Sequence, residues 1–263
     1  MTVVTPSADL SKLLRLAQLA AREIMAVYAS DFAVRAKADL SPVTEADAMA
    51  EKVILKGLKE LWPDVPVLAE EAAAGGDVPD VGKRFFLVDP LDGTKEFLNR
   101  NGEFTVNIAL VENGRPVMGV VYAPATAQMF WGETEKGAGF AKVNPGDALT
   151  DVKWLALQVR KTPAEGLTVV ASRSHMDANT TAYLESCKVK SLTSAGSSLK
   201  FCLVAKGEAD LYPRFGRTME WDTGAGQAVL EAAGGKVCNV DGTPLRYGKA
   251  ERGFDNPAFI AGA

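Results

Sequence analysis

The sequence restricts its fold and chemistry most tightly in one string, Leu87 to Thr94, which reads Leu-Val-Asp-Pro-Leu-Asp-Gly-Thr. An apolar strand predicted over residues 84–89 runs directly into two aspartates that are three positions apart. Pro90 restricts the backbone between them and removes one hydrogen-bond donor. Gly93 permits a backbone conformation that other residues rarely adopt, so a ligand can approach the chain closely. The string therefore predicts hard oxygen ligands beside a backbone that can hold an anion, at the end of a buried strand.

Two carboxylates held this close together need a counter-charge. Two unit charges about 4 Å apart repel by about 4 kcal/mol at an effective dielectric constant of about 20. Either one carboxylate takes up a proton or a cation lies between them. Magnesium suits such oxygen sites and shares its coordination shell with water and substrate phosphate. A helix or turn that begins at Thr94 would add N–H groups for a phosphate oxygen. The alternative, a solvated Asp-Gly turn, is disfavoured by the buried strand that precedes it.

Three other acidic residues are candidates to join this site. Glu70 closes a predicted strand over residues 65–71 and is followed by a second glutamate. Asp222 lies at the start of an apolar helix predicted over residues 221–233. Asp47 lies in the first turn of the second predicted helix. Each also has a purely structural interpretation, as a solvated strand end, a helix N-cap and a capping-box residue, respectively.

The order of predicted elements changes in the middle of the chain. Hydrophobic periodicity predicts amphipathic helices over residues 10–28 and 44–62, and alternation around the Asn113-Gly114 turn predicts an antiparallel meander over 106–141. The second half alternates strands and helices, which is typical of a layered α/β unit. Its predicted strands are 168–171, 191–193, 209–213 and 236–240, and its predicted helices are 177–187, 197–206 and 221–233. Pro and Gly residues interrupt the pattern near 145–165. We therefore expect an α+β part over residues 1–150 and an α/β part over residues 151–263.

Composition excludes several classes of protein. The chain has 263 residues, of which 47% are hydrophobic and 24% charged, so it is neither disordered nor fibrous. A net charge of -4 gives no general electrostatic reason to bind nucleic acid. The N-terminal residues lack the basic and apolar regions of a signal peptide, and no uncharged run approaches the ~18 residues of a membrane span. Without a C-x-x-C pair, the cysteines are expected to be free thiols in the cytoplasm: Cys187, Cys202 and Cys238.

The acidic motifs together resemble the three-part signature of the lithium-sensitive, magnesium-dependent phosphomonoesterases, the inositol monophosphatase superfamily. These motifs are Glu70-Glu71, the string Asp89 to Thr94, and Trp221-Asp222 with Gly226 four residues on. Longer strings resemble the superfamily's bacterial 3'(2'),5'-bisphosphate nucleotidases. They are Ser41 to Thr44, Asp89 to Phe97, Asn101 to Leu110, Gly196 to Cys202, and Tyr212 to Phe215. The resemblance extends from about residue 10 to residue 260.

The resemblance implies a fold and a set of roles. The fold is an α/β, more strictly α+β, five-layered αβαβα sandwich. The resemblance implies two or three Mg²⁺ ions, and the implied metal ligands are Glu70, Asp89, Asp92, Asp222 and the carbonyl oxygen of Leu91. Asp47 and Thr94 correspond to the catalytic pair that orients the attacking water molecule, and Gly93 with Thr94 corresponds to the backbone that holds the scissile phosphate. Several of these residues would therefore contact substrate as well as metal: Glu70, Leu91, Asp92, Gly93, Thr94 and Asp222.

The resemblance also implies a substrate. Ser197 and Lys200 share one face of the predicted helix over 197–206, and by resemblance these two residues and Arg214 would contact a nucleotide. Arg173 is a weaker candidate. The implied reaction converts adenosine 3',5'-bisphosphate to AMP and phosphate. The sulfated form, 3'-phosphoadenylyl sulfate, would also be a substrate, which places the enzyme in sulfur assimilation. The small-molecule nucleotide is the expected partner, with no nucleic acid, an undetermined oligomeric state, and peripheral contact with the inner membrane left open by the bacterial relatives.

Two alternatives remain at this point. An inositol monophosphatase or broader sugar phosphatase would use the same metal site without the nucleotide contacts. A non-catalytic nucleotide- or RNA-associated protein is disfavoured by the intact acidic set and the overall acidity. Two departures from the resembling pattern bear on the site. Thr223-Gly224 introduces a glycine that is expected to loosen the helix after Asp222, and Glu220 is expected to add negative charge near an anion site. His175 is assigned to a loop rather than to catalysis.

Overall fold

The computed structural model describes residues 2–30, 34–36, 42–172 and 177–263. His175, Arg173 and Ser41, which the sequence analysis considered, lie outside the described residues. The helices of these ranges are α1 (Ala8–Tyr28), α2 (Glu45–Leu61), α3 (Glu70–Ala74), α4 (Thr94–Leu98), α5 (Ala178–Glu185), α6 (Leu199–Ala205) and α7 (Glu220–Ala232). Single 3-10 turns follow at Pro124–Thr126, Leu149–Asp151 and Ala250–Arg252. None of the described helices is long and apolar enough to cross a membrane.

The first sheet has eight strands in the order β1-β10-β9-β8-β7-β6-β5-β4. In chain order they are β1 (Val3–Val4), β4 (Val67–Ala69), β5 (Arg84–Asp92), β6 (Thr105–Glu112), β7 (Arg115–Ala123), β8 (Gln128–Glu133), β9 (Gly137–Lys142) and β10 (Trp154–Ala156). The meander expected over residues 106–141 is confirmed, because β6 to β9 pair antiparallel in sequence order. Two short strands were not predicted: β1 and β10 pair with each other at one edge.

The two faces of this sheet carry two separate hydrophobic cores. Phe86, Val88 and Ile108 point to the core beneath α1 and α2. Phe85 and Leu87, which alternate with them along β5, point to the core beneath α6 and α7. Both faces are buried because a strand's side chains alternate between faces and each face here has helices packed on it. β5, which ends in the two aspartates, is therefore held from both sides.

Small residues let α7 lie directly on the backbone of the first sheet. Gly119 and Gly132 are cross-strand partners on β7 and β8. A Cβ atom at Gly132 would lie 2.4 Å from the carbonyl oxygen of Ala228 on α7, and one at Gly119 would lie 2.6 Å from that of Ala225. These distances are shorter than atoms allow without a shift of the helix. The glycines therefore set how closely α7, which carries Asp222, approaches the sheet.

The second sheet has five strands in the order β12-β11-β13-β15-β14. These are β11 (Leu167–Ala171), β12 (Val189–Ser194), β13 (Leu211–Arg214), β14 (Lys236–Asn239) and β15 (Phe259–Gly262), and β2 (Val34–Ala36) with β3 (Pro42–Thr44) forms a separate ribbon. Strand β15 was not predicted; it pairs antiparallel with both β13 and β14.

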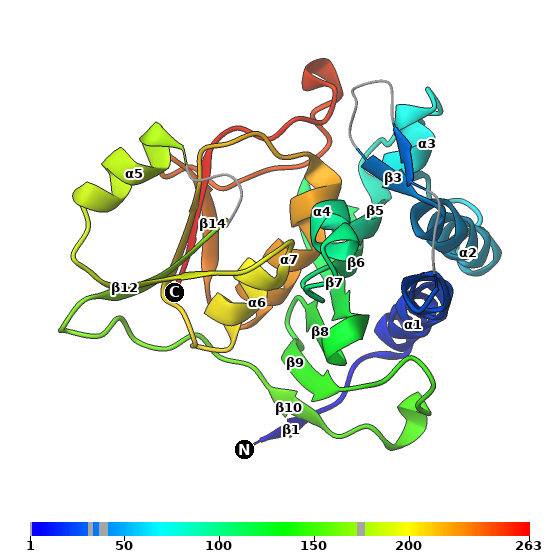
Figure 1. Ribbon diagram of the computed structural model, residues 1–263, viewed down its shortest axis with the longest axis horizontal. Helices are drawn as coiled ribbons and strands as arrows, with labels where there is room; N and C mark the ends of the chain where they lie inside the picture. The colour runs from blue at the N-terminus through cyan, green and yellow to red at the C-terminus, as the bar shows by residue number, and fades with distance from the viewer. Residues whose placement is uncertain (1, 31–33, 37–41, 173–176) are drawn as a thin grey trace.

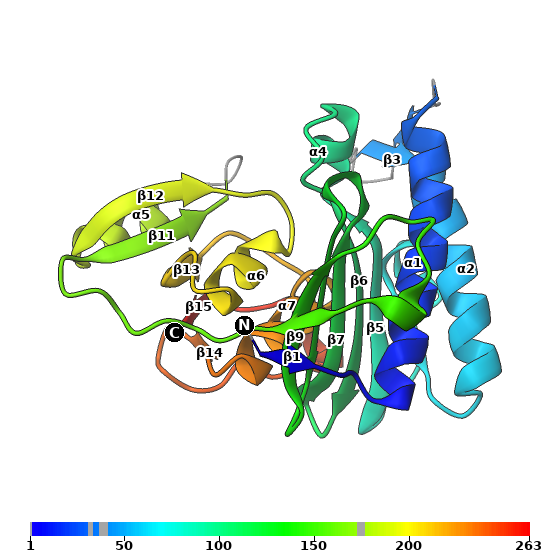
Figure 2. The ribbon, with the colours of Figure 1, turned by 90° about the horizontal axis from the view of Figure 1, so that it is seen from below.

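Five layers follow from this arrangement. In Figure 2 the helices α1 and α2 cover the outer face of the first sheet, α6 and α7 lie between the two sheets, and Figure 1 shows α5 on the far side of the second sheet. The αβαβα sandwich that the resemblance implied is thus confirmed. All strands of the first sheet come from residues 3–156 and those of the second from 167–262. The division into separate parts near residue 150 stays a prediction.

Gly132→Ala is expected to destabilise the fold, because the added methyl group must displace α7 from the sheet. Overpacking of this kind typically costs about 1–3 kcal/mol. Denaturant unfolding measures the loss of free energy. Gly146→Ala is the matched control, since a Cβ atom there meets nothing within 4 Å. Equal stability of the two variants would contradict the close approach of α7.

Candidate active site

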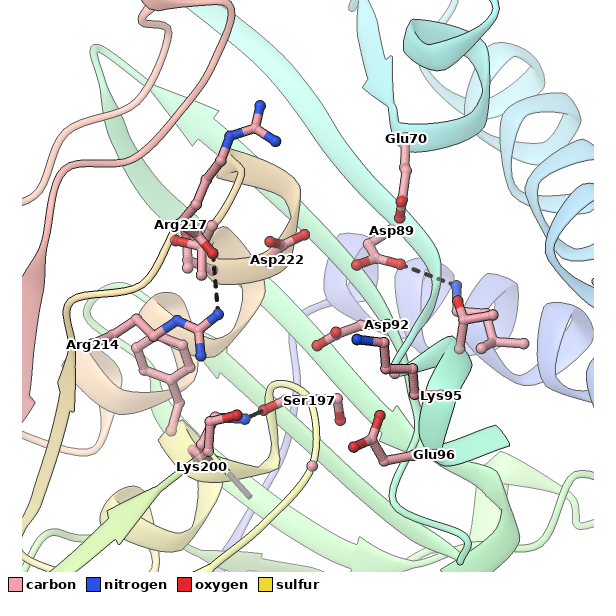
Figure 3. Close-up of a pocket in the computed structure, with 18 of the residues that line it drawn as sticks. Glu70, Asp89, Asp92, Lys95, Glu96, Ser197, Lys200, Arg214, Arg217 and Asp222 are labelled. Atoms are coloured by element: carbon pink, nitrogen blue, oxygen red, sulfur yellow. Dashed lines mark hydrogen bonds between the residues drawn. The ribbon is translucent and has the colours of Figure 1, made fainter. Parts of the chain in front are cut away.

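A cavity of about 450 Å³ brings most of the predicted site residues together at the junction of the two sheets. Figure 3 shows its side chains, with Glu70, Asp89 and Asp92 on one wall and Lys200, Arg214 and Arg217 on the other. The predicted residues that line it are Glu70, Asp89, Leu91, Asp92, Gly93, Thr94, Ser197, Lys200, Arg214 and Asp222. Cavity-lining residues to which the sequence analysis assigned no role in the site are Lys95, Glu96, Ser172, Gly196, Phe201, Tyr212, Arg217, Thr218 and Thr223.

A break in the strand ladder delivers the two aspartates of the central string. Asp89 pairs with Asn107 and Asp92 with Thr105, and the register shifts between these pairs. The carboxylate of Asp89 folds back to accept a hydrogen bond from the Leu91 N–H at 3.1 Å. Gly93 then adopts a φ of 93°, a left-handed conformation that favours glycine, and α4 begins at the next residue. The predicted uncommon conformation at Gly93 and the helix start at Thr94 are confirmed, whereas β5 extends to Asp92, beyond the predicted end of the strand at residue 89.

Glu70 reaches the cavity from the first residue of α3, not from the end of a strand. The strand predicted over 65–71 is therefore too long, since β4 ends at Ala69. The reason is a long-range cap: the buried carboxylate of Glu51 on α2 accepts hydrogen bonds from the N–H groups of Glu71 at 2.8 Å and Ala72 at 2.9 Å. Burial raises the pKa of Glu51 to about 7. The sequence around Glu70 gives no indication that Glu51, 20 residues before Glu71, caps this helix.

Asp222 is fixed by the start of α7. It is the third residue of the helix, not its N-cap, and its carboxylate accepts a hydrogen bond from the Met219 N–H at 2.8 Å. Its carbonyl oxygen accepts a hydrogen bond from the Ser198 hydroxyl at 2.7 Å. That hydroxyl also lies 3.4 Å from a carboxylate oxygen of Asp92. Ser198 thus ties α7 to the end of β5.

Burial, with neighbouring negative charges second to it, sets the pKa values of the carboxylates on this wall. Burial, followed by the charges of Glu70, Asp92 and Asp222, raises the pKa of Asp89 well above its ordinary value. Burial and the charge of Asp92 do the same to the pKa of Asp222. Burial also raises the pKa of Asp92 to about 6, against the opposing effect of the Lys200 charge. These carboxylates hold their protons more strongly than free ones, because burial and neighbouring carboxylates both disfavour the charged form.

Asp47 is absent from the cavity lining, unlike the other predicted site residues. It is 1% exposed on α2, and its charge contributes to the raised pKa of Asp89. The predicted pairing of Asp47 with Thr94, the first residue of α4, therefore stays a hypothesis about residues that approach the carboxylates from opposite helices.

The opposite wall is basic and held in place by its own backbone. The Lys200 ammonium group donates hydrogen bonds to the carbonyl oxygens of Ser197 and Ala195 and lies 5.4 Å from the ring centre of Tyr212. Burial lowers the pKa of Lys200 to about 8. The guanidinium group of Arg214 donates to the carbonyl oxygens of Gly216 and Arg217 at 3.1 and 3.0 Å.

Ser197 links the basic wall to the acidic one. Its φ of 45° is unusual for a residue other than glycine. Its hydroxyl accepts a hydrogen bond from the Thr105 hydroxyl at 3.1 Å. Asn107 lies within 3.1 Å of that Thr105 hydroxyl, and its amide nitrogen lies 3.5 Å from Asp92. A continuous polar row thus runs from the basic wall to Asp92.

The structure shows the surroundings of Glu220 and Gly224, the two departures from the resembling pattern. Glu220 is fully buried and points to the C-terminal segment, where the N–H groups of Gly248 and Lys249 donate to it. Its carboxylate also forms an ion pair with the Lys249 ammonium group at 2.7 Å. Gly224 lies against the sheet, where a Cβ atom would meet a methyl group of Leu87 at 2.8 Å. Glu220 is thus paired with Lys249 and does not line the cavity, contrary to the expectation of an added charge at the anion site. The loosening of the helix by Gly224 stays a prediction.

The donor set of the acidic wall suits a hard divalent cation. All its side-chain donors are carboxylate oxygens: those of Glu70, Asp89, Asp92 and Asp222. After burial, the neighbouring negative charges are the next cause that raises the pKa values of Asp89 and Asp222. Magnesium prefers oxygen ligands and keeps open positions for water and phosphate. The residues present therefore fit Mg²⁺.

Comparison with known proteins points to the same chemistry. The profile of the inositol monophosphatase family matches residues 8–259. The 3'(2'),5'-bisphosphate nucleotidase CysQ of Escherichia coli K12 is 48% identical over 252 residues, covering 95% of this chain and 98% of that protein. The CysQ of Haemophilus influenzae is 31% identical and covers 95% of this chain and 91% of its own. Enzymes of the family depend on metal ions, generally Mg²⁺.

Solved structures agree with these sequence matches. CysQ from Bacteroides thetaiotaomicron, a bacterial member of the inositol monophosphatase family, superposes with a TM-score of 0.81 at 38% identity over 97% of each chain. An inositol monophosphatase from Zymomonas mobilis superposes with a TM-score of 0.77 at 25% identity, covering 98% of this chain and 94% of that one.

The metal-free protein is expected to lose stability as pH rises. A carboxyl group whose folded pKa is raised favours folding below its unfolded pKa, and this contribution is lost as pH increases through the folded value. For Asp92 the window runs from 3.8 to about 6. With a chelator present, the Tm of the protein should therefore be several degrees lower at about pH 7.5 than at about pH 5. Mg²⁺ should reverse most of the loss.

Asp92→Asn tests the cause of this pH dependence. The amide keeps an acceptor for Ser198 and removes the charge, so the metal-free variant should melt above the unmodified protein at about pH 7.5. Asp64→Asn, at an exposed position, is the control and should leave the Tm unchanged. A lower Tm for the Asp92 variant would show that repulsion at this wall is not what destabilises the protein.

Proposed function

We propose that this chain, which belongs to the inositol monophosphatase family, hydrolyses the 3'-phosphate of adenosine 3',5'-bisphosphate to give AMP and phosphate. The single observation that carries the proposal is the two-walled cavity, because an acidic metal wall faces the basic wall of Lys200 and Arg214. The CysQ relatives, at 48% identity and with nearly complete coverage, are named for this activity. By the same chemistry 3'-phosphoadenylyl sulfate is a substrate, which places the enzyme in sulfur metabolism.

The acidic wall would hold the metal ions. We assign Glu70, Asp89, Asp92, Asp222 and the Leu91 carbonyl oxygen as ligands for two or three Mg²⁺ ions. When bound, Mg²⁺ supplies charge neutralisation for the carboxylates, acidifies water and offsets the charge of the phosphoryl group. The hydrogen bond from Met219 to Asp222 and the one from Leu91 to Asp89 keep these two carboxylates in a fixed orientation for that purpose.

The hydrolytic step then depends on positioning. The attacking water molecule is oriented by Thr94 and Asp47, which also accepts its proton in the proposed assignment. The backbone at Gly93 and Thr94 approaches the phosphate closely, because the left-handed turn at Gly93 leaves no side chain in the way. Charge that develops on the phosphoryl oxygens is held by groups already fixed by the fold, which lowers the barrier without reorganisation.

The basic wall would select the substrate. Ser197 lies in the loop before α6, Lys200 on α6 and Arg214 at the end of β13. All three side chains face the acidic wall across the cavity (Figure 3). A bisphosphate carries a second anion that an inositol monophosphate lacks. Arg214 is pre-oriented by its bonds to Gly216 and Arg217, so it can bind this second anion with little loss of side-chain entropy.

Phosphate release measures the proposed function directly. Adenosine 3',5'-bisphosphate and inositol 1-phosphate are compared side by side with Mg²⁺ and then with added Li⁺. We expect release from the nucleotide at a kcat/KM at least about tenfold higher than from the inositol ester, because only the nucleotide engages both walls. Li⁺ should inhibit both reactions. Preference for the inositol ester would replace the proposed substrate and leave the metal wall in place.

Arg214→Gln separates substrate selection from chemistry. Loss of a charged partner for the second anion should raise the KM for adenosine 3',5'-bisphosphate by about tenfold or more. The same preparation should hydrolyse inositol 1-phosphate at nearly the original rate, which serves as an internal control for folding. An equal loss on both substrates would assign Arg214 a structural role only.

A further inference from the structure

We propose that Lys95 binds the phosphate group that is cleaved, as the cation of the acidic wall. The proposal rests on the proposed phosphatase function and goes beyond the metal ligands, the catalytic pair and the nucleotide contacts assigned above. Lys95 is the second residue of α4, directly after Thr94, and it lines the cavity. Figure 3 shows its side chain reaching from α4 into the same space as Asp92 and Glu96.

Among the described residues that line the cavity, the position of Lys95 distinguishes it from the other cations. Lys200, Arg214 and Arg217 belong to the opposite wall, which is built by α6, β13 and the loop that follows β13. Lys95 comes from the short segment that also supplies Asp92 and Thr94. A charge on that segment is adjacent in sequence to the residues proposed to hold the cleaved phosphate, whereas the other three belong to the wall proposed to face the nucleotide.

The ammonium group of Lys95 is also uncommitted. Lys200 is bonded to two carbonyl oxygens, Arg214 to two more, and Arg217 forms an ion pair with Asp255 at 2.9 Å. Over the described parts of the chain, the exposed side chain of Lys95 forms no hydrogen bond or ion pair. A cavity cation without a protein partner is available to a ligand and loses no existing interaction on binding.

The balance of charges around the cavity supports a phosphate-binding role for Lys95. The cavity is lined by five carboxylates and four cations. If two divalent ions neutralise four of the carboxylates, Glu96 and the four cations leave a net charge of about +3 for a substrate with two anionic groups. The basic wall can meet the distal anion. On the side of the dianionic phosphate that is cleaved, Lys95 adds a flexible point charge to that of the proposed metal ions, as lysines do for phosphates elsewhere.

Product inhibition tests the proposal because the two products report on the two walls. Orthophosphate occupies the position of the cleaved group, and AMP carries the distal phosphate. For Lys95→Gln we expect the inhibition constant of orthophosphate to rise about tenfold and that of AMP to change less than about twofold. The KM for the substrate should rise with the orthophosphate constant. Lys95→Arg should restore both values to within about threefold of the original.

The control variant is Lys161→Gln, which removes the same charge from an exposed loop position outside the cavity. It should leave both inhibition constants unchanged. An unchanged orthophosphate constant in Lys95→Gln, or a rise for AMP alone, would overturn the proposal. Failure of the proposed function has a different signature: the unmodified protein would prefer inositol 1-phosphate, and the orthophosphate test would then be carried out with that ester.

Discussion

The constraint on which this structure depends is the burial of several carboxylates close to one another at the end of β5. Asp89, Asp92 and Asp222 all have raised pKa values, and burial and neighbouring negative charges are the leading causes. Such a cluster costs stability, so the surrounding elements must hold it without help from the charges themselves. Two hydrophobic cores on the two faces of the first sheet do this, together with backbone hydrogen bonds that fix the carboxylates. A divalent cation bound as proposed would offset the unfavourable free energy of burying these carboxylates together.

Much of the site could be predicted because its signals are local. The string from Asp89 to Thr94 contains the break in the ladder, the left-handed glycine and the start of α4 within six residues. The meander and the long helices were likewise predicted from periodicity. What could not be predicted depends on distant partners. Glu51 decides that α3 starts at Glu70, and two N–H groups near residue 248 decide that Glu220 turns away from the cavity.

Some fold elements were missed for a similar reason. Strand β1 has only two residues and exists because β10 lies beside it, so neither has a pattern of its own. The close approach of α7 also required the structure. Nothing in the sequence indicates that Gly119 and Gly132 lie beneath the same helix. The sequence around Gly224 predicts a loosened helix and does not indicate that this glycine packs against Leu87 of the sheet. In each case tertiary packing decided the outcome, which local propensity does not report.

The polar row from Lys200 through Ser197, Thr105 and Asn107 to Asp92 has an evolutionary consequence. Hydrogen bonds connect the residues that would contact the substrate to a residue that would bind the metal. A descendant that changed its preferred ester by altering this loop would also disturb the geometry of hydrolysis. New specificities are therefore more accessible through positions outside the row, such as the exposed Arg217, and the row itself is expected to drift slowly while the rim of the cavity diversifies.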